Sequence, residues 1–518
     1  MRFRTFALSC ALVGCSSNSS SPAPPNDASV RDASVAEAGP IVDGGSDAYS
    51  TPDAPADVGL ELDAGPCTSP DFAGSPFGIH CNQLVDSQGR TAIIHGINAR
   101  IPGVFDNSFT DGRQAHEPLP PFGASDVQRM RALGFNTLRL PINWSAVEPT
   151  EDGGISTSYL DTVASITAMC AAANLNVLVD LHQDDYSKEI GEDGAPLWAI
   201  QPPPTQLLGG PVPSNDNESG QVLSAFSTFF DPTNGVYLRQ RYTAMATAVA
   251  ARFADDPAVV GFELYNEPYT GDELLHALYD EMVPSMRAAA PKKLLFWEPY
   301  SLRIESGAAE TGDGGPIGPG TVYAVHIYNI GTAWGNEATL LQTLSNAQGE
   351  AQSWGAPLVV TEYGYDPSSS GFAPWVDALQ DVASDVGASD MFWLWKEESG
   401  GFWGLYSFDD AGVATERPAT VRTLTRARLE ALAGTLVSVS YDETAQKLEV
   451  QFIGSSAITA ANVVSVGAEA SPPAAQWMAT CDGASVQTNG ADPLQIPCGG
   501  DGSHVLVVTG GPAAGGDQ

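Results

Sequence analysis

Short apolar runs recur through the middle of the chain, and each is bounded by polar or turn-forming residues. Continuous apolar runs of this length are typical of buried parallel strands, which are covered by protein on both faces. Eight runs are predicted as strands: residues 93–98, 137–141, 176–181, 259–266, 294–298, 322–328, 358–362 and 391–395.

Helix-like segments separate most of these runs. Residues 129–134 end in a glycine that is typical of a helix C-terminus, and residues 237–253 and 274–289 repeat apolar positions at helical spacing. Eight strands that alternate with helices over roughly three hundred residues predict an α/β fold, the (β/α)8 or TIM barrel.

After about residue 434 the pattern changes to alternation of apolar and polar positions, as in residues 436–441 and 447–452. A period of two predicts half-buried strands. We therefore expect a small C-terminal β-sandwich domain over residues 434–511, after a barrel domain over residues 67–433. The sandwich either binds carbohydrate or only packs on the barrel, and the second is favoured because its sequence lacks a trio of exposed aromatic residues.

The N-terminal segment has a different character. Residues 1–15 begin with basic residues and continue with a short apolar stretch that ends at Cys15, which predicts an export signal too short to span a bilayer. The segment resembles a bacterial lipoprotein signal, which implies a lipidated Cys15 and, with Ser16 next to it, an outer-membrane lipoprotein. An ordinary export signal with a chance cysteine, and hence a secreted protein, stays open. Residues 16–66 are rich in Ser, Pro, Ala and Asp and predict a disordered acidic tether.

Composition narrows the range of partners. The 518 residues include 23 Lys and Arg against 62 Asp and Glu, a formal net charge of −39. Because phosphate binding needs clustered cations, this balance argues against a nucleic-acid partner and against docking on anionic lipid through basic patches. We expect a monomer that meets a membrane only through its N-terminal lipid anchor.

The cysteines suggest disulfides rather than a metal site. Export makes two close pairs plausible, Cys67 with Cys81 and Cys481 with Cys498. Cys170 lies in a helical run and is expected in the core. No pair has the two-residue spacing of metal-ligating cysteines, so a metal site is disfavoured.

Polar residues gather at the C-terminal ends of the predicted strands, where the functional groups of such barrels lie. Singly each has an ordinary explanation, such as a core histidine or a structural ion pair, but together they predict one cleft. The residues are Arg139, His182, Asp184, Asn266, Glu267, Glu298, His326, Tyr328, Glu362 and Trp395. A metal site at Asp184 and Asp185 is disfavoured because no further carboxylate cluster accompanies them.

Two glutamates stand out among them, Glu267 and Glu362, because each follows an apolar run. A lone glutamate after a strand is commonly a helix N-terminal charge. A matched pair suits hydrolysis of a glycosidic bond, which needs one protonated and one ionised carboxyl group. Pro268 predicts an extended backbone at Glu267, and Asn266 offers an amide to a sugar hydroxyl.

The barrel resembles glycoside hydrolase family 5, the large cellulase-type family, in which the acid/base and the nucleophile end the fourth and seventh strands. The resemblance implies that Glu267 is the acid/base and Glu362 the nucleophile. It also implies substrate-binding roles for the remaining residues: Arg139 holding the nucleophile, His182 with Asp184 and Asn266 at the sugar, His326 and Tyr328 beside the nucleophile, and Trp395 as a stacking platform.

Residues 181–187 and 194–199 further resemble the endoglycoceramidase branch of that family, whose members release glycans from glycosphingolipids. One departure is that only Arg100 supplies the basic residue that the branch has after its first strand. An insertion with apolar residues at 202–204, 207–208 and 226–230 either forms a groove for a lipid or is a plain ordered loop.

Three functions are therefore weighed. The first is a retaining β-glycosidase that acts on glycolipids, the second is an endo-β-glucanase of cellulase type, and the third is a non-catalytic surface protein that binds glycans. Retention requires the two carboxyl groups to lie about 5 to 5.5 Å apart and Glu267 to start protonated, its pKa raised by burial and by its anionic partner. No cofactor and no metal are expected.

Overall fold

A computed structural model describes residues 71–212, 219–301, 318–328, 337–385, 387–397, 403–409, 411–467, 469–470 and 472–510, without the side chains of 337–341 and 385. The predicted signal, the tether, Cys15 and Cys67 lie outside these residues. Within them, no helix combines the length and the apolar character that crossing a membrane requires.

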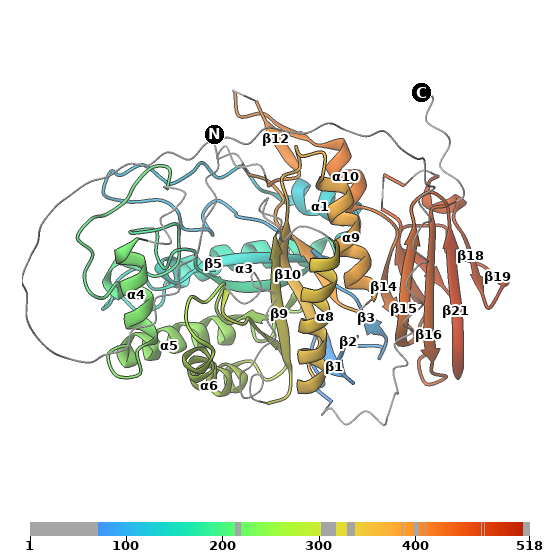
Figure 1. Ribbon diagram of the computed structural model, residues 1–518, viewed down its shortest axis with the longest axis horizontal. Helices are drawn as coiled ribbons and strands as arrows, with labels where there is room; N and C mark the ends of the chain where they lie inside the picture. The colour runs from blue at the N-terminus through green and yellow to red at the C-terminus, as the bar shows by residue number, and fades with distance from the viewer. Residues whose placement is uncertain are drawn as a thin grey trace, which may run out of the picture. The chain divides into compact units, whose positions relative to one another are not determined.

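Eight parallel strands close into a barrel, which confirms the predicted fold (Figure 1). Each predicted run overlaps one of the strands, and the order of the strands around the barrel follows the chain. The strands are β4 (His95–Asn98), β5 (Thr137–Asn143), β6 (Asn176–His182), β7 (Val259–Glu263), β8 (Leu294–Trp297), β9 (Thr321–Tyr328), β10 (Leu358–Gly364) and β11 (Ser389–Phe392).

Helices follow most of the strands and cover the barrel, and all three predicted helical segments are helical. Gly134 follows the first helix with a φ of +93°, a conformation that suits glycine at a helix end. The helices are α1 (Ala124–Ala132), α2 (Trp144–Val147), α3 (Thr157–Ala172), α4 (Gly220–Phe230), α5 (Val236–Phe253), α6 (Asp272–Ala289), α8 (Glu337–Trp354), α9 (Phe372–Asp385) and α10 (Pro418–Leu424).

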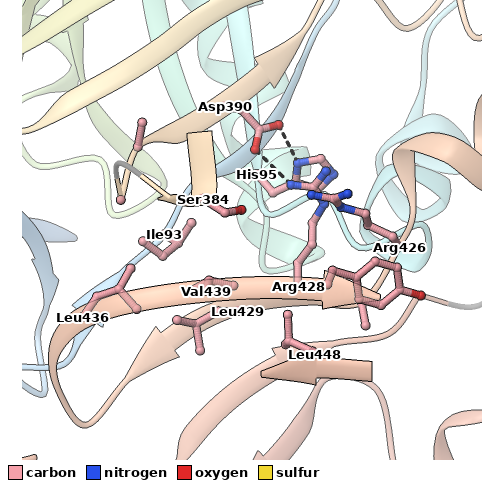
Figure 2. A pocket seen from close by; sticks show the side chains of 14 residues that line it. Ile93, His95, Ser384, Asp390, Arg426, Arg428, Leu429, Leu436, Val439 and Leu448 are labelled. Atoms are coloured by element: carbon pink, nitrogen blue, oxygen red, sulfur yellow. Dashed lines mark hydrogen bonds and ion pairs between the residues drawn. The ribbon is translucent and has the colours of Figure 1, made fainter. Parts of the chain in front are cut away.

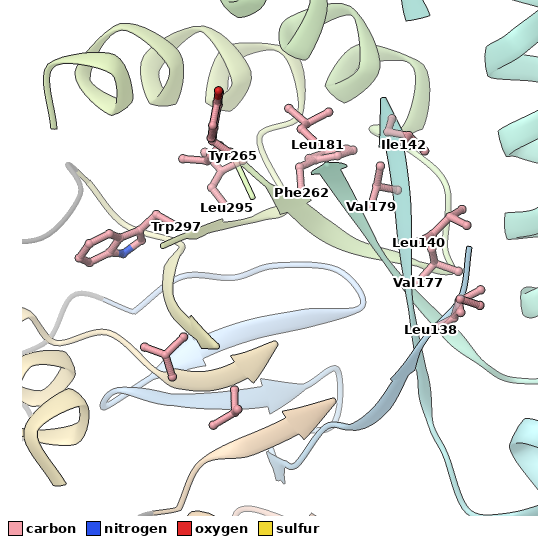
Figure 3. Packing of buried hydrophobic residues seen from close by; sticks show 14 of the residues in the cluster. Leu138, Leu140, Ile142, Val177, Val179, Leu181, Phe262, Tyr265, Leu295 and Trp297 are labelled. Atoms are coloured by element: carbon pink, nitrogen blue, oxygen red, sulfur yellow. The ribbon is translucent and has the colours of Figure 1, made fainter. Parts of the chain in front are cut away.

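The apolar runs are continuous because both faces of each strand are buried. On β6, Val177 and Val179 pack in the layer between strands and helices (Figure 3), whereas Leu178 between them packs inside the barrel. Gly261 on β7 allows close approach to β8, since a Cβ there would lie 2.2 Å from the main-chain oxygen of Leu294. This packing fixes the strand ends that carry the candidate site.

Two antiparallel sheets with a shared apolar core form the predicted β-sandwich. One has the order β1 (Phe77–His80), β2 (Gln83–Asp86), β3 (Thr91–Ala92), β14 (Arg428–Leu432), β17 (Asn462–Ser465) and β20 (Leu494–Ile496). The other has the order β15 (Gly434–Asp442), β16 (Lys447–Gly454), β21 (Gly502–Thr509), β18 (Met478–Cys481) and β19 (Ala484–Val486). A separate hairpin joins β12 (Tyr406–Phe408) to β13 (Ala414–Glu416).

The first sheet combines strands from before and after the barrel. β3 pairs with β14, and the Thr91 hydroxyl donates a hydrogen bond to the Gly434 carbonyl at 2.7 Å. The chain therefore enters the barrel from the sandwich and returns to it, and the predicted boundary at residue 434 falls between β14 and β15.

Barrel and sandwich also meet at a small cavity of about 30 Å³ (Figure 2). Asp390 on β11 accepts a hydrogen bond from Nη1 of Arg428 at 3.0 Å and lies 2.9 Å from Nδ1 of His95. Burial opposes ionisation of Asp390, but the charge of Arg428 and the contact with His95 outweigh it and keep the pKa of Asp390 below its usual range. These groups lie at the N-terminal end of the strands, where charged residues of a barrel serve stability.

The cysteines are placed largely as expected. Cys481 and Cys498 form a disulfide, which confirms that pair. Cys81 is disulfide-bonded, and its predicted partner Cys67 is outside the described residues. Cys170 is free and buried in α3, and burial raises its pKa to about 12.

Candidate active site

Arg139 on β5 lies at the centre of the C-terminal end of the barrel and is fully buried. Its Nε donates to Oε2 of Glu263 at 2.5 Å, one Nη donates to Glu362, and the other donates to Oδ1 of Asn266 at 2.8 Å. Oδ2 of Asp180 lies 3.0 Å from the same guanidinium. Arg139 therefore connects three strands and holds the carboxyl group of Glu362, where the sequence placed it.

Glu362 lies within β10, with only 3% of its surface exposed. One of its oxygens accepts from Arg139 and the other accepts from the Tyr328 hydroxyl at the end of β9. Because both donors come from rigid strands, the carboxyl group has a fixed orientation, which suits a nucleophile that must attack along one line. Burial and the nearby charge of Glu362 raise the pKa of Tyr328, so it remains a donor at neutral pH.

Glu267 follows β7, and its side chain is 34% exposed. Its Oε1 lies 2.8 Å from Nδ1 of His326, and its main-chain N–H donates to Oε2 of Glu298 at 3.2 Å. Loss of hydration in the cleft raises the pKa of Glu267, while the nearby His182 and Arg139 act in the opposite direction. A raised pKa is what a general acid at neutral pH needs.

The backbone at Glu267 differs from the expectation. Its φ is +40°, in the left-handed region, so the extended conformation predicted from Pro268 is wrong. A non-glycine residue is strained in this region and stays there only when its surroundings hold it. The hydrogen bond from the Glu267 N–H to Glu298, which comes from another strand, is one such restraint.

The two glutamates face each other across the cleft. One oxygen of Glu267, one oxygen of Glu362 and a ring nitrogen of His326 all lie within 4.8 Å of one another. This upper limit on the separation of two oxygens is consistent with the ~5 Å between the carboxyl groups of retaining glycosidases and is below the ~6.5–9.5 Å of inverting ones. The same three groups could approach a metal ion, but Arg139 and Tyr328 already occupy the oxygens of Glu362.

His182 at the end of β6 forms one wall of the site. Its Nδ1 lies 2.6 Å from Oδ2 of Asp180, and its ring stacks on Trp393 with centroids 5.6 Å apart and an interplanar angle of 11°. Burial lowers the pKa of His182 to about 3, so the ring is neutral at pH 7. His182 and Trp393 thus offer a flat, uncharged wall next to Glu267 and Glu362.

Trp395 does not belong to this wall, so its prediction as the stacking platform is wrong. Its indole is fully buried, donates to Oδ1 of Asp126 at 2.9 Å and packs against Tyr406. The strand β11 ends at Phe392, before the end of the apolar run, and a cis peptide bond follows Trp393. The apolar run alone could not distinguish the two tryptophans.

Asn266 and Asp184 lie at the site in different ways. The side chain of Asn266 is held by the protein, because it accepts from Arg139 and donates one amide N–H to the Gln183 carbonyl at 2.9 Å. Asp184 lies in an acidic loop, and burial together with the nearby Glu192 raises its pKa well above the usual value. Asn266 therefore helps to orient Arg139, and Asp184 is one of the acidic residues of that loop.

Arg100, the basic residue noted after the first strand, lies on the same side of the site as Trp393. Its guanidinium is paired with Glu117 and with Glu397, the latter at 2.7 Å. Its charge is therefore already neutralised by two carboxylates. Arg100 also lies 5.7 Å from the centroid of the Trp393 ring, so it supports that side of the wall.

Three residues of the site, Asp180, Glu263 and Glu298, were given no role from the sequence. Asp180 and Glu263 are acidic residues inside otherwise apolar strands, and that exception was the signal that could have found them. Burial raises the pKa of Asp180 to about 7 and, together with the charge of Glu263, raises that of Glu298 well above its usual value. One guanidinium therefore lies among several carboxyl groups, not all of which are ionised.

The insertion between β6 and β7 was expected to form either a groove for a lipid or a plain ordered loop, and its residues are divided between a buried part and an exposed part. Phe226, Phe229 and Phe230 on α4 belong to the core, so they do not form a groove. Leu223 on the same helix and Tyr269, two residues after Glu267, are exposed, and the ring of Tyr269 lies 5.8 Å from that of Phe226. An exposed apolar edge thus begins beside Glu267.

Known proteins with similar sequences are glycosyl hydrolases. The sequence model of "Cellulase (glycosyl hydrolase family 5)" matches residues 115–399. Endoglycoceramidase I of Rhodococcus hoagii is 31% identical over 232 residues, which cover 42% of this chain and 44% of that protein. Endoglycoceramidase of Cyanea nozakii is 27% identical over 221 residues, 37% and 41% of the two chains. The chain thus matches less than half the length of these curated relatives.

The solved structures extend the similarity to most of the chain. Endo-glycoceramidase II from a Rhodococcus species, solved as a lactosyl-enzyme intermediate, superposes with a TM-score of 0.68 at 26% sequence identity. The match covers 83% of this chain and 100% of that one. It therefore includes the β-sandwich as well as the barrel.

Proposed function

The chain belongs to glycosyl hydrolase family 5, and from that premise we propose that it is a retaining β-glycosidase that releases the glycan from glycolipids. One observation carries the proposal. Glu267 and Glu362 have oxygens within 4.8 Å of each other but opposite surroundings, since Glu362 accepts from Arg139 and Tyr328 whereas burial raises the pKa of Glu267. Such a pair separates the roles of nucleophile and acid.

In the first step an oxygen of Glu362 attacks the anomeric carbon, and the bond from that carbon to the leaving oxygen breaks. Glu267 gives its proton to the leaving oxygen, so the aglycone departs as an alcohol. In the second step Glu267, now ionised, takes a proton from water, and the water oxygen displaces Glu362 from the anomeric carbon. Two inversions at that carbon return the original configuration.

Arg139 and Tyr328 serve this chemistry by donating to the two oxygens of Glu362, which orients the carboxyl group for attack on the anomeric carbon. The neutral wall of His182 and Trp393 offers one face for a sugar ring to stack against. Glu267 provides its proton at the open side of the cleft, where the aglycone would leave.

A lipid aglycone is favoured by what lies at that side. Tyr269, two residues after Glu267, exposes apolar surface, and Leu197, Leu207 and Leu223 are exposed in the insertion. Two relatives of similar sequence are named endoglycoceramidases, and the similar structure of an endo-glycoceramidase II is a lactosyl-enzyme intermediate. An apolar edge beside a polar cleft suits an amphiphilic substrate.

The location and the assembly state are part of the proposal. The N-terminal segment with Cys15 supports an exported outer-membrane lipoprotein, and a lipid anchor would hold the enzyme close to membranes that contain its substrate. We propose a monomer, because the site is assembled from strands of one chain. The alternative of a secreted protein without an anchor needs no change in the chemistry.

An endo-β-glucanase is the second candidate, favoured by the cellulase description of the family model. The purified protein is assayed for release of reducing sugar from lactosylceramide in detergent micelles and from soluble β-glucans. We expect a higher rate on the lipid than on the glucans. In added methanol we expect part of the sugar to be trapped as its β-methyl glycoside. Preference for the glucans would replace the first candidate by the second, and no release from either would leave a glycan-binding protein.

Glu362→Gln and Glu267→Gln test the assignment of the two carboxyl groups. We expect each to lower kcat/KM for lactosylceramide at least ~10³-fold, because each removes a group that acts in the transition state. Glu273→Gln on the exposed start of α6 is the matched control and should keep the full rate. An unchanged rate in either site variant would contradict the mechanism.

A further inference from the structure

Two buried polar atoms at the base of the site face each other without a hydrogen bond. Glu298 directly follows β8 and His326 lies on β9, and both are almost completely buried. Oε1 of Glu298 and Nε2 of His326 are 3.4 Å apart, and neither has a hydrogen-bond partner among the described residues. Two unpaired buried acceptors would be costly, so a proton between them is the simplest way to satisfy both.

The position of that proton matters because the other ring nitrogen of His326 contacts Glu267. Burial lowers the pKa of His326 to about 4, so at pH 7 the neutral ring carries one hydrogen, on either Nδ1 or Nε2. A hydrogen on Nε2 would point to Glu298 and leave Nδ1 as an acceptor that attracts the proton of Glu267. A hydrogen on Nδ1 would instead donate to Oε1 of Glu267, 2.8 Å away, and Nε2 would then need a donor.

Glu298 can be that donor only as a neutral acid, and its surroundings favour this form. Burial is the largest cause that raises its pKa, followed by the charge of Glu263. Arg139 opposes this, but its Nη2 is 3.9 Å away and the guanidinium is already shared with Asp180, Glu263 and Glu362. The ionisable groups that face Glu298 or its main chain are Arg139, Glu263, Glu267, Tyr279, His326 and Glu362.

We propose that Glu298 is a positioning residue for the acid/base. As a neutral carboxylic acid it donates from Oε1 to Nε2 of His326, which fixes the hydrogen of the ring on Nδ1. That N–H then holds Oε1 of Glu267, so the proton of Glu267 lies on Oε2, the oxygen left free for the leaving group. The inference rests on the proposed function.

The second oxygen of Glu298 acts on the same residue. Oε2 accepts from the main-chain N–H of Glu267 at 3.2 Å, which helps to hold the left-handed φ of +40° there. Glu298 therefore contacts the acid/base twice, through its backbone and through His326. No net proton transfer is required of Glu298, because the proton that reaches the leaving oxygen comes from Glu267 and is replaced from water.

Two variants test the neutral form. Gln at position 298 has a permanent N–H donor without charge, so Glu298→Gln should move the alkaline limb of the kcat/KM profile by less than about 0.3 pH unit. If Glu298 were ionised, removing its charge from so close to Glu267 would lower that limb by about one unit or more, which would overturn the proposal.

Glu298→Met removes the donor. We expect kcat/KM to fall ~100-fold for lactosylceramide, whose leaving oxygen needs a proton, and less than about threefold for a dinitrophenyl lactoside, whose leaving group does not. An equal fall on both substrates would indicate a structural role and refute the proposal. Tyr279→Phe is the matched control, since it removes only the hydroxyl that donates to the main-chain carbonyl of Glu298, and should behave like the wild type.

The tautomer of His326 can be observed without turnover. In the resting protein with 15N-labelled histidine, His326 is assigned by its absence in His326→Gln, and the signals of a protonated Nδ1 and an unprotonated Nε2 are expected. The reverse tautomer would overturn the inference even if the enzyme is active. A protein that releases sugar from neither lipid nor glucan, yet shows the expected tautomer, would contradict only the proposed function.

Discussion

Replacing Arg139 by Met removes the guanidinium that contacts Glu263, Asp180 and Glu362. Glu263 lies 2.5 Å from it and Asp180 lies 3.0 Å from it. Each charge-assisted contact contributes about 1.5–3 kcal/mol, so their gross loss is roughly 5–9 kcal/mol. Protonation of the abandoned carboxyl groups recovers part of this, and we expect the free energy of unfolding to fall by about 3–5 kcal/mol at pH 8.

The pH dependence of that loss follows from the sign of the pKa changes. Arg139 opposes the effect of burial on Asp180 and Glu298, so without it the folded-state pKa values of these two groups rise further above their unfolded values. Such groups stabilise the fold below the unfolded pKa, and that stability is lost as the pH rises through the folded pKa. The difference between variant and wild type should therefore shrink as the pH is lowered from 8 towards 4.

Urea unfolding followed by tryptophan fluorescence at pH 8, 6 and 4 measures this difference. Arg252→Met is the control, because Arg252 pairs with Asp161 on the surface at 3.1 Å and such a pair contributes less than about 1 kcal/mol. The activity of Arg139→Met should fall ~10²–10³-fold, since Glu362 loses a donor. A destabilisation below about 1 kcal/mol at pH 8, or one that grows as the pH falls, would refute the reasoning.

Two further changes test other parts of the fold. Replacing Cys481 and Cys498 by Ser together should lower the free energy of unfolding by about 3 kcal/mol relative to the disulfide-bonded wild type, because the disulfide closes a loop with a sequence separation of 17. Equal stability of the variant and the disulfide-bonded wild type in urea titrations would contradict this. Asp180→Asn removes a carboxyl group whose pKa is raised to about 7. The stability of this variant relative to the wild type should therefore increase between pH 4 and pH 8, by up to roughly 4 kcal/mol. If the stability difference between the two proteins does not change with pH in thermal or urea unfolding, Asp180 titrates normally.

The barrel was predictable because its strands are buried on both faces and therefore read as apolar runs. Each of the eight runs overlaps a strand; Glu362 ends one run and Glu267 directly follows another. The pairing of β3 with β14 was not predictable, since it joins residues more than three hundred positions apart and neither strand carries a mark of its partner. The predicted roles of the site residues themselves stay predictions until the variants are measured.

The errors have local causes. Trp393 and Trp395 both belong to the last apolar run, and only the point where β11 ends distinguishes the one at the site from the one in the core. Pro268 favours an extended Glu267 in a free chain, but the hydrogen bond from its N–H to Glu298 belongs to another strand and helps to hold φ at +40°. Contacts from distant residues thus outweighed a preference of the neighbouring residue.

The sequence by itself determined which residues lie near the C-terminal ends of the strands, because each apolar run overlaps a strand and the residues that follow it are fixed by covalent order. Only the tertiary structure decided how far apart Glu267 and Glu362 lie, and which of the carboxyl groups around Arg139 carry protons. The distance between the two glutamates depends on the closure of the barrel. The protonation of the carboxyl groups depends on burial and on charges that come from several different strands. Neither quantity is a property of any segment of the chain taken alone.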